Sequence, residues 1–438
     1  MSQFNGLIPI LKFSSDMKPV STVAVLEAPA LDDSPPVEQS NKPVALAERE
    51  MFVVAIKDFA SLEQYVPAWE DLARSALEPN PFYESWMLIP ALQKFSVGKD
   101  LQLVLVFAPN RARPKEPPLL CGVFPLNRKP RYKGLPVSVL SLWKHIYCFL
   151  CTPLVRADCA RKCLSAFFDW LASDPSSSPL VEFNFVSGEG PFHQALVDTL
   201  NERLSLSFVS DTYNRAMFKP RASADDYLRE AMSREHRKDV RRKTRRFAEL
   251  GHLEYTELEP DGDVDGWLEE FMQLEMKGWK GELGGALGSS EANRAYFRTV
   301  AKEAFRRGRL KMTALESNGE RVAQKCNFLA ENGSFAFKIA YDENYSRYSP
   351  GLLVEMENIR RLHETPEIEW MDSCAVPVHF MINRLWLDRR TIQTVLIPTG
   401  KRPGELIVSL MPMIRWINRR VKGISNSRHQ VGNEQGDS

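Results

Sequence analysis

The sequence predicts a mixed α/β fold in which strands and helices are interleaved along most of the chain. Short apolar runs typical of buried strands recur between segments whose apolar residues follow helical spacing. In the second half, the expected order is basic helix, strand, two helices, three antiparallel strands, helix and strand. The 438 residues are 44% hydrophobic and 26% charged, which is enough for two or three domains with cores of their own.

The charge balance and the cysteine content narrow the class of protein. Lys and Arg number 57 and Asp and Glu 56, so the formal net charge is +1. This balance argues against a globally basic nucleic-acid binder and still permits a local basic patch. We expect no signal peptide and no membrane-spanning segment. Seven cysteines without secretory marks favour reduced thiols in a cytoplasmic protein.

The first half of the chain is expected to form one mixed unit behind a disordered segment. Residues 1–48 are rich in Pro, Ser and acidic side chains and have little to bury. Residues 49–215 form the expected unit, and residues 211–233 look like a crossing into a second one. Strands are expected at 51–56, 101–109, 117–130 and 179–186, and helices at 62–77, 160–173 and 190–204.

The second half, residues 216–398, has clearer start and stop signals. Ser233 is placed to cap a basic helix that ends at Gly251. Two Asn-Gly pairs, at 318–319 and 332–333, are strong hairpin signals. The other expected elements are three antiparallel strands within 310–342, single strands at 252–258 and 368–376, and helices at 264–281, 289–310 and from 350 onward.

The stretch "YDENYSRYSPGLLVEMENIRRL", residues 341–362, changes from aromatic and polar to helical at Ser349-Pro350-Gly351. Free N–H groups at a helix start, with the helix dipole behind them, suit a phosphate. Pro350 removes one donor, whereas Gly351 permits close approach of a ligand to the backbone. Plain helix initiation explains the same residues and stays open as the alternative.

Four short motifs together carry a family resemblance. They are "RKDVRRKTRRFAELG", "GWKG" after a helix, "FAFKIAYDENYSRYSPG" and the acidic strand "IEWMDS". With them, residues from about 225 to 390 resemble the acetyltransferase domain of the GNAT superfamily. The nearest branch is the cellulose-biosynthesis (CelD/BcsL) and BioF2-like acetyltransferases, which are related to FemAB-like proteins. The first half looks like a degenerate copy, so the resemblance implies a tandem GNAT-like acyl-CoA N-acyltransferase fold.

The resemblance implies an acyl-CoA co-substrate, most simply acetyl-CoA, and no metal. In the family, the pyrophosphate lies on a loop with the consensus Gln/Arg-x-x-Gly-x-Gly/Ala that opens a helix. This chain has Arg347-Tyr-Ser-Pro-Gly351-Leu instead, and Leu352 departs from the pattern. The expected cofactor-binding residues are Arg347, Tyr348, Ser349, Gly351 and Leu352.

Transfer of an acyl group from a thioester to an amine requires that the amine lose a proton, that the oxyanion be stabilised and that the thiolate gain a proton. Candidate bases are Asp342, just beyond a strand, and Asp372 in "IEWMDS", although both are also typical turn or cap residues. Tyr341 or Tyr348 is the candidate acid. His379 is a candidate proton acceptor.

Three residues are candidates for substrate binding. Trp279 and Lys280 precede a Gly-rich loop that is expected to cover a substrate or to be an ordinary surface loop. Lys338 lies within a strand and faces either the cleft or solvent. Cys374, near His379, suggests a Cys–His nucleophile, which is the less favoured hypothesis because such a pair arises easily by chance.

Two clusters admit more than one interpretation. Cys148, Cys151, Cys159 and Cys163 are close in sequence, but their spacing is short for a zinc ribbon, so small buried hydrophobes are favoured. The basic helix 234–246 suits tRNA or an anionic acceptor. It lacks interleaved aromatic residues, so a solvated face is the alternative.

The C-terminal region, residues 399–438, is expected to contain an amphipathic helix and a disordered tail. Apolar residues recur on one face from Leu406 to Val421, and Pro412 is expected to kink the helix. Docking on its own domain is favoured over contact with a membrane surface.

The expected activity is acyl transfer, acetyl in the simplest case, to an amine or hydroxyl of a cell-surface or exopolysaccharide precursor. The expected location is the cytoplasm, at the inner face of the membrane. One alternative is a FemAB-like transferase that uses aminoacyl-tRNA. Another is a non-catalytic binding module with the GNAT fold.

Overall fold

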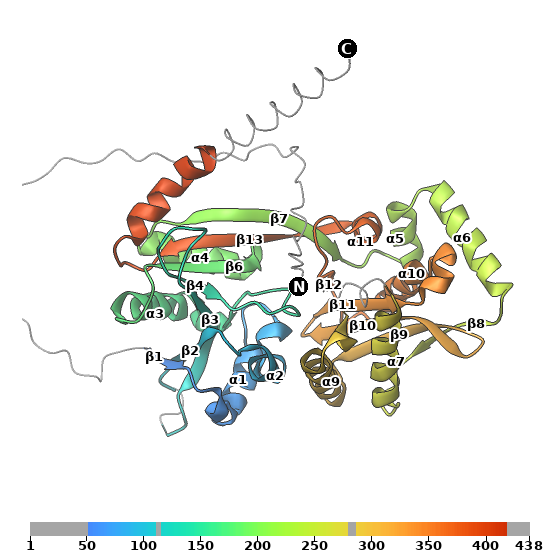
Figure 1. The fold of residues 1–438 in the computed structure, drawn as a ribbon, viewed down its shortest axis with the longest axis horizontal. Coiled ribbons are helices and arrows are strands. Elements are labelled where there is room, and N and C mark those ends of the chain that lie inside the picture. The colour runs from blue at the N-terminus through green and yellow to red at the C-terminus, as the bar shows by residue number, and fades with distance from the viewer. Residues whose placement is uncertain (1–50, 111–114, 279–285, 418–438) are drawn as a thin grey trace, which may run out of the picture. The chain divides into compact units, whose positions relative to one another are not determined.

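A computed structural model describes residues 51–110, 115–278 and 286–417. The predicted disordered segment 1–48 lies outside these residues. The described strands form one mixed sheet of 13 strands with helices on its faces (Figure 1). The mixed α/β fold class is therefore confirmed. The strands of the first half are β1 (Phe52–Ile56), β2 (Asp100–Ala108), β3 (Leu119–Lys129), β4 (Val139–Leu142), β5 (Leu154–Val155), β6 (Leu180–Ser187) and β7 (Phe208–Phe218).

The second half contributes the remaining strands and the helices that surround the candidate site. Its strands are β8 (Leu253–Glu257), β9 (Leu310–Ser317), β10 (Glu320–Ala330), β11 (Gly333–Tyr341), β12 (Trp370–Asp372) and β13 (Asp388–Pro398). The helices are α1 (Val66–Arg74), α2 (Ser85–Phe95), α3 (Ala160–Ser173), α4 (Gly190–Glu202), α5 (Ala224–Ala231), α6 (Arg234–Ala248), α7 (Val264–Lys277), α9 (Glu291–Arg306), α10 (Pro350–His363) and α11 (Phe380–Leu385). A further helical stretch covers 404–417.

The predicted start signals of the second half are confirmed. The Ser233 hydroxyl accepts a hydrogen bond from the His236 N–H at 3.2 Å at the start of α6. The Ser290 hydroxyl accepts one from the Asn293 N–H at 3.2 Å at the start of α9. The two hairpins form the antiparallel meander β9-β10-β11. Local capping and turn chemistry therefore fix this part of the fold.

The two halves are joined through strands that the sequence analysis did not identify. The order along the sheet is β1-β2-β3-β4-β6-β13-β7-β12-β11-β10-β9-β8, and β5 pairs with β3. The last strand, β13, therefore lies between β6 and β7 of the first half, as Figure 1 shows. Residues 211–233 were predicted as a crossing, but their first part belongs to β7, and the expected border at 215/216 falls inside this strand.

Two further predictions need correction. The expected strand 368–376 is only three residues long, because the chain turns away after Asp372. The expected helix 264–281 ends at Lys277, and Gly278 follows in an extended conformation. Helix α2 was not predicted, because its residues are buried almost throughout and show no amphipathic period.

The largest apolar core is shared by both halves. It combines β2, β3 and α3 with α7, α9 and the meander, and the rings of Phe82 and Phe335 meet edge to face with centroids 5.3 Å apart. A second core lies between α5, α6, α10 and the opposite face of the meander. Alternate side chains of β9 supply the two cores, since Ala314 faces the first and Leu315 the second.

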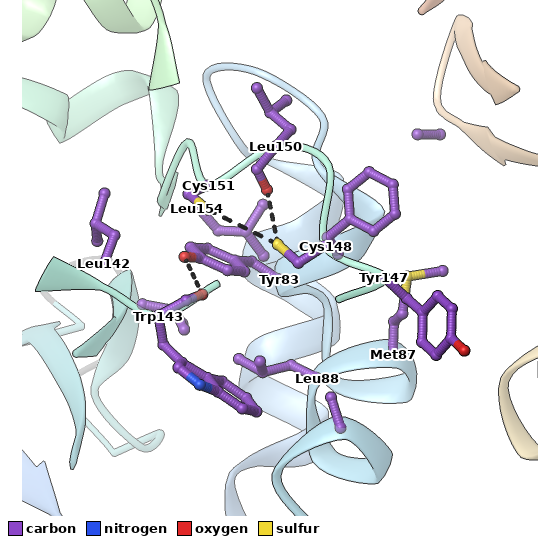
Figure 2. Packing of buried hydrophobic residues seen from close by; sticks show 14 of the residues in the cluster. Tyr83, Met87, Leu88, Leu142, Trp143, Tyr147, Cys148, Leu150, Cys151 and Leu154 are labelled. Atoms are coloured by element: carbon purple, nitrogen blue, oxygen red, sulfur yellow. Dashed lines mark hydrogen bonds between the residues drawn. The ribbon is translucent and has the colours of Figure 1, made fainter. Parts of the chain in front are cut away.

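The clustered cysteines belong mainly to the first core, as predicted. Cys148 and Cys151 are fully buried, with their Sγ atoms 3.8 Å apart beside Tyr83 (Figure 2). Cys163 is also fully buried, whereas Cys159 is half-buried. In the described part of the chain, no group of three or more His, Cys, Asp or Glu side chains is placed to hold a metal ion.

The helical stretch 404–417 packs on its own domain, as favoured by the sequence. Val408 and Met411 are buried against Tyr132 and Leu396. The helical assignment continues through Pro412, although proline has no N–H to donate to the preceding turn. No helix within the described ranges is long and apolar enough to cross a membrane.

His145 lies inside an aromatic cluster and gives the fold a pH dependence. Its ring stacks on Phe95 and meets Trp143 and Tyr296, with centroid distances of 5.3–5.4 Å. Burial, assisted by Lys144, lowers the pKa of His145 from its usual 6.5 to about 3. The imidazole is therefore neutral in the folded protein at neutral pH.

We expect the free energy of unfolding to fall by about 2 kcal/mol between pH 7 and pH 5 because of His145. The unfolded chain binds a proton near pH 6.5 and the folded protein does not, so this contribution is present above pH 6.5 and is lost towards pH 3. Urea unfolding at the two pH values measures the effect. His145→Phe should remove this part of the slope, whereas replacing the exposed His252 with Gln should leave it; equal slopes in all three proteins would contradict the assignment.

Candidate functional site

A pocket of about 310 Å³ opens at the start of α10. Its walls come from α6, the end of β11, the start of α10, and α11. The lining residues are Met232, His236, Lys243, Tyr341, Ser346, Ser349, Pro350, Gly351, Leu352, Phe380, Met381, Arg384 and Leu385. We call this the α10 pocket.

The start of α10 is unusual because Ser349 adopts a left-handed conformation, with φ 59° and ψ 51°. Such a conformation costs a non-glycine residue about 1–3 kcal/mol and is found preferentially at functional sites. Its hydroxyl does not cap the helix. Instead, the Lys243 ammonium donates to the Ser349 hydroxyl at 3.4 Å. The strained residue thus brings the helix start and a cation together.

The backbone of the first turn leaves a donor available to a ligand. The N–H groups of Leu352 and Leu353 donate to the Ser349 carbonyl at 2.9 and 3.1 Å, and Pro350 has no N–H. The Gly351 N–H has no backbone acceptor among the described residues. A Cβ atom at Gly351 would lie 3.1 Å from the Tyr341 ring, so the glycine permits close packing of helix and strand.

Three basic side chains face the α10 pocket. His236 and Lys243 lie on α6, two helical turns apart, and Arg384 lies on α11. Lys243 also pairs with Asp239 at 3.1 Å. The Arg384 guanidinium lies over the Phe380 ring at 4.0 Å and has no carboxylate partner in the described part of the chain. The pocket therefore combines positive charge with a helix N-terminus, which together favour an anion.

The sheet opens beside this pocket. β11 runs to Tyr341, but it pairs with β12 only through Gly333–Phe335 and Trp370–Asp372. Beyond Phe335 the two parallel strands separate. Beyond Phe335, β11 therefore pairs with β10 alone among the described strands.

The predicted cofactor-binding residues fall into two groups. Ser349, Gly351 and Leu352 line the α10 pocket. Tyr348 does not, because it is buried and stacks on Phe247 with centroids 4.8 Å apart. Arg347 is exposed, and its guanidinium lies over the Tyr348 ring at 4.7 Å. For these two residues the structure indicates packing roles.

Of the predicted catalytic residues, only Tyr341 lines the α10 pocket. Asp342 caps the short helix Glu343–Tyr348 by accepting the Asn344 N–H at 2.9 Å. His379 begins α11, and its Nδ1 accepts the Ile382 N–H at 3.3 Å. Both residues therefore have a local structural task.

Asp372 lies in a buried ion-pair network. Its carboxylate is fully buried and accepts hydrogen bonds from Arg215 at 2.6 Å and from Arg390 at 3.1 Å. It also accepts the Cys374 N–H at 2.9 Å. Since Arg215 is on β7 and Arg390 on β13, the network connects the two halves of the sheet. The structure places Asp372 at this junction and not in the α10 pocket.

Lys338 also has a buried partner. Its ammonium lies 2.6 Å from the fully buried Glu275, and Glu275 also accepts the Leu287 N–H at 2.7 Å. The other two predicted substrate-binding residues, Trp279 and Lys280, lie outside the described residues. The alternative Cys–His nucleophile is disfavoured, because burial, reinforced by Asp372, raises the pKa of the Cys374 thiol well above its usual range.

Sequence reasoning missed the cations of the α10 pocket as a group. Lys243 and His236 belong to the basic helix, and their seven-residue spacing, which places side chains on one helical face, was the available signal. Arg384 was missed because α11 was not predicted. Its six residues are too few for a periodic pattern, and only the fold brings them beside α10.

Comparison with known proteins finds a family similarity in the part of the chain around this pocket. Residues 234–375, from α6 to just beyond β12, match the family model described as acetyltransferase (GNAT) domain. A search of curated protein sequences found no match. This part of the chain is therefore similar to GNAT-type acetyltransferase domains, and the expected GNAT fold is confirmed. The cellulose-biosynthesis branch is not among these findings.

Solved structures resemble this chain at low sequence identity, and of those described here FemX, with a TM-score of 0.50, supports the fold. The crystal structure of FemX has a TM-score of 0.50 and 10% identity, with 78% of this chain and 98% of that chain covered. The C-terminal domain of a putative lysylphosphatidylglycerol synthetase from Agrobacterium fabrum has a TM-score of 0.46 and 10% identity, with 80% and 96% covered. A tandem GNAT protein from the clavulanic acid biosynthesis pathway has a TM-score of 0.38 and 12% identity, with 80% and 99% covered.

Proposed function

We propose that the protein transfers an acyl group, acetyl in the simplest case, from acyl-CoA to an amine or hydroxyl, and that the α10 pocket binds the pyrophosphate of the donor. The observation that carries the proposal is the convergence of Ser349, Gly351 and Lys243 at the start of α10. A pyrophosphate there would accept the Gly351 N–H and face Lys243 and Arg384. Charge-assisted hydrogen bonds of this kind are stronger than neutral ones.

We place the rest of the donor along the part of β11 that has no pairing with β12. An extended chain that enters from the α10 pocket would reach the middle of the sheet, where the strand edge of β11 offers backbone groups beyond Phe335. In the transfer step, the acceptor nitrogen or oxygen attacks the thioester carbonyl, a C–N or C–O bond forms, and the C–S bond breaks. The proton that the acceptor loses balances the one that the departing thiolate gains, and Tyr341, beside Gly351, belongs to the pyrophosphate end of the donor.

The family resemblance suggests a cell-surface or exopolysaccharide precursor, assembled in the cytoplasm at the inner face of the membrane. The exposed apolar side of the helical stretch 404–417 fits contact with that membrane, since Leu406 and Met413 are 61% and 52% exposed. The acceptor amine or hydroxyl would approach the thioester from the side of β12.

We expect Lys243→Glu and Arg384→Glu each to weaken acetyl-CoA binding at least about tenfold, because each reverses a charge at the pyrophosphate. Titration calorimetry measures the affinity. Arg246→Glu is the matched control: Arg246 is exposed on the same helix and lies outside the pocket, so affinity should change less than about twofold.

The same titrations separate the rival functions. Binding of aminoacyl-tRNA with no binding of acetyl-CoA would replace the proposal with tRNA-dependent aminoacyl transfer. Binding of acetyl-CoA without release of free thiol in the presence of amine acceptors would leave a binding module. Equal affinities for acetyl-CoA in all three variants would remove the α10 pocket from the proposal.

A further inference from the structure

A second groove, of about 780 Å³, lies on the other side of α6, between α5, α6, α10 and β8. Seven of the side chains that line it are basic, and one, Asp225, is acidic. We call it the α6 groove. The basic residues are Arg229, Arg234, Arg237, Lys238, Arg241, Arg245 and Arg360.

Much of this positive charge is not neutralised by the protein itself. Arg229 pairs with Asp226, and Arg360 pairs with Glu357 at 3.3 Å. The Arg237 guanidinium donates to backbone carbonyls, including that of Arg229 at 3.0 Å. The remaining four basic residues have no carboxylate within ion-pair distance in the described part of the chain. They are Arg234, Lys238, Arg241 and Arg245.

The base of the α6 groove is apolar. Leu228 and Met232 come from α5 and the residue after it, Val240 from α6, and Leu353 and Met356 from α10. Cations at the rim and aliphatic side chains below them match a ligand that is itself amphiphilic. A phosphate group would meet the cations, while a hydrocarbon chain would displace water from the apolar base.

The same residues argue against nucleic acid as the occupant. Among the described residues that line the groove, Tyr255 is the only aromatic one. Successive bases would therefore lack stacking partners. The net charge of +1 over the whole chain also argues against a globally basic nucleic-acid binder.

We infer that the α6 groove binds an anionic amphiphile, a phosphate group that carries an alkyl chain. Neighbouring members of these four unpaired cations hold the phosphate, and the aliphatic base holds the chain. Met232 lines both the α6 groove and the α10 pocket, so the bound amphiphile lies next to the donor site. The inference concerns binding alone and stands whether or not the α10 pocket holds acyl-CoA.

The test compares dodecyl phosphate, below its critical micelle concentration, with inorganic phosphate, hexyl phosphate and uncharged dodecyl maltoside. Calorimetry on the full chain should show dodecyl phosphate binding at least about tenfold more tightly than hexyl phosphate, because additional methylene groups are buried. Dodecyl maltoside and inorganic phosphate should each bind more weakly than dodecyl phosphate. Raising the salt concentration should weaken the binding.

Arg241→Glu should lower the affinity for dodecyl phosphate at least about tenfold. Arg241 is exposed and unpaired, so its replacement leaves the fold intact. Arg246→Glu is again the matched control: it carries the same charge change on the same helix outside the groove, and it should bind like the wild type. Acetyl-CoA affinity, measured in parallel, should be unchanged in Arg241→Glu, which separates this inference from the proposed donor site.

Three outcomes would overturn the inference. Equal affinities for inorganic phosphate and dodecyl phosphate would show that the apolar base does not contribute. Equal losses in Arg241→Glu and Arg246→Glu would show binding to general surface charge. Binding of tRNA that Arg241→Glu abolishes, together with absent binding of dodecyl phosphate, would assign the groove to nucleic acid.

Discussion

Replacing Glu355 with Ala is expected to lower the free energy of unfolding by about 3–5 kcal/mol. Glu355 and Lys325 form an ion pair of 2.6 Å in which both side chains are at most 2% exposed. Glu355 also accepts hydrogen bonds from Asn358 at 3.1 Å and Trp386 at 3.2 Å. Its removal leaves a buried ammonium without a counter-charge and the Trp386 N–H without an acceptor, while the Asn358 amide keeps only the weakly accepting sulfur of Met371. Urea unfolding monitored by tryptophan fluorescence measures the loss.

Two further variants locate the cause. Glu355→Gln keeps an acceptor for Trp386 and Asn358 but not the counter-charge, so its loss should be smaller than that of the alanine variant. Glu202→Ala is the surface control, because Glu202 pairs with Arg161 at 2.7 Å and both side chains are mostly exposed. Exposed pairs contribute about 0–1 kcal/mol. A Glu355→Ala variant as stable as Glu202→Ala would refute the role of the buried pair.

Gly351→Val is expected to weaken acetyl-CoA binding at least about a hundredfold. A Cβ atom at Gly351 would already lie 3.1 Å from Tyr341 Cδ1 and 3.8 Å from Ile339 Cδ1. The two methyl groups of valine would force Tyr341 to move or would occupy the space beside the Gly351 N–H. Either change removes close approach of a pyrophosphate to the helix start.

Stability must be measured beside affinity in this series. Overpacking at Gly351 is expected to cost about 1–3 kcal/mol, which leaves a folded protein to titrate. Gly351→Ala adds a single carbon and should lie between the wild type and Gly351→Val in acetyl-CoA affinity. A folded Gly351→Val protein with wild-type affinity would rule out the start of α10 as the donor site.

The fold class and many element positions could be predicted because local signals decide them. Ser233 and Ser290 cap their helices, and the two Asn-Gly pairs close the hairpins of the meander. Strands such as β2 are buried along nearly their whole length and read as apolar runs. These features depend on residues that are neighbours in sequence.

β7 escaped prediction because its sequence is polar and half-exposed, and Arg215 within it reads as a surface residue. Arg215 is 2% exposed in the fold, where Asp372 is its partner 157 positions away. Nothing within a short window of sequence indicates such a pair. The placement of β13 between β6 and β7 is likewise a long-range pairing.

The residues of the candidate site likewise fall into those that a local sequence pattern predicts and those whose role depends on packing. The sequence singled out Ser349, Gly351 and Leu352, because a helix start with a glycine is visible as a local pattern. It could not separate these residues from Arg347 and Tyr348, whose side chains turn towards Phe247 and each other. Which way a side chain of the turn before α10 points depends on how α6 packs against that turn.

By itself, the sequence determined the alternation of strands and helices, the meander, the basic helix and the helix start at Gly351. Periodicity, caps and turns act over a few residues, so these features are encoded locally. Only the tertiary structure decided that Lys243 and Arg384 meet at that helix start, that Asp372 is locked between Arg215 and Arg390, and that the outer face of α6 borders a cationic groove. Charged residues that are far apart in sequence meet only once the strands have paired. A buried charge then requires its partner, because an unpaired charge inside the protein is costly.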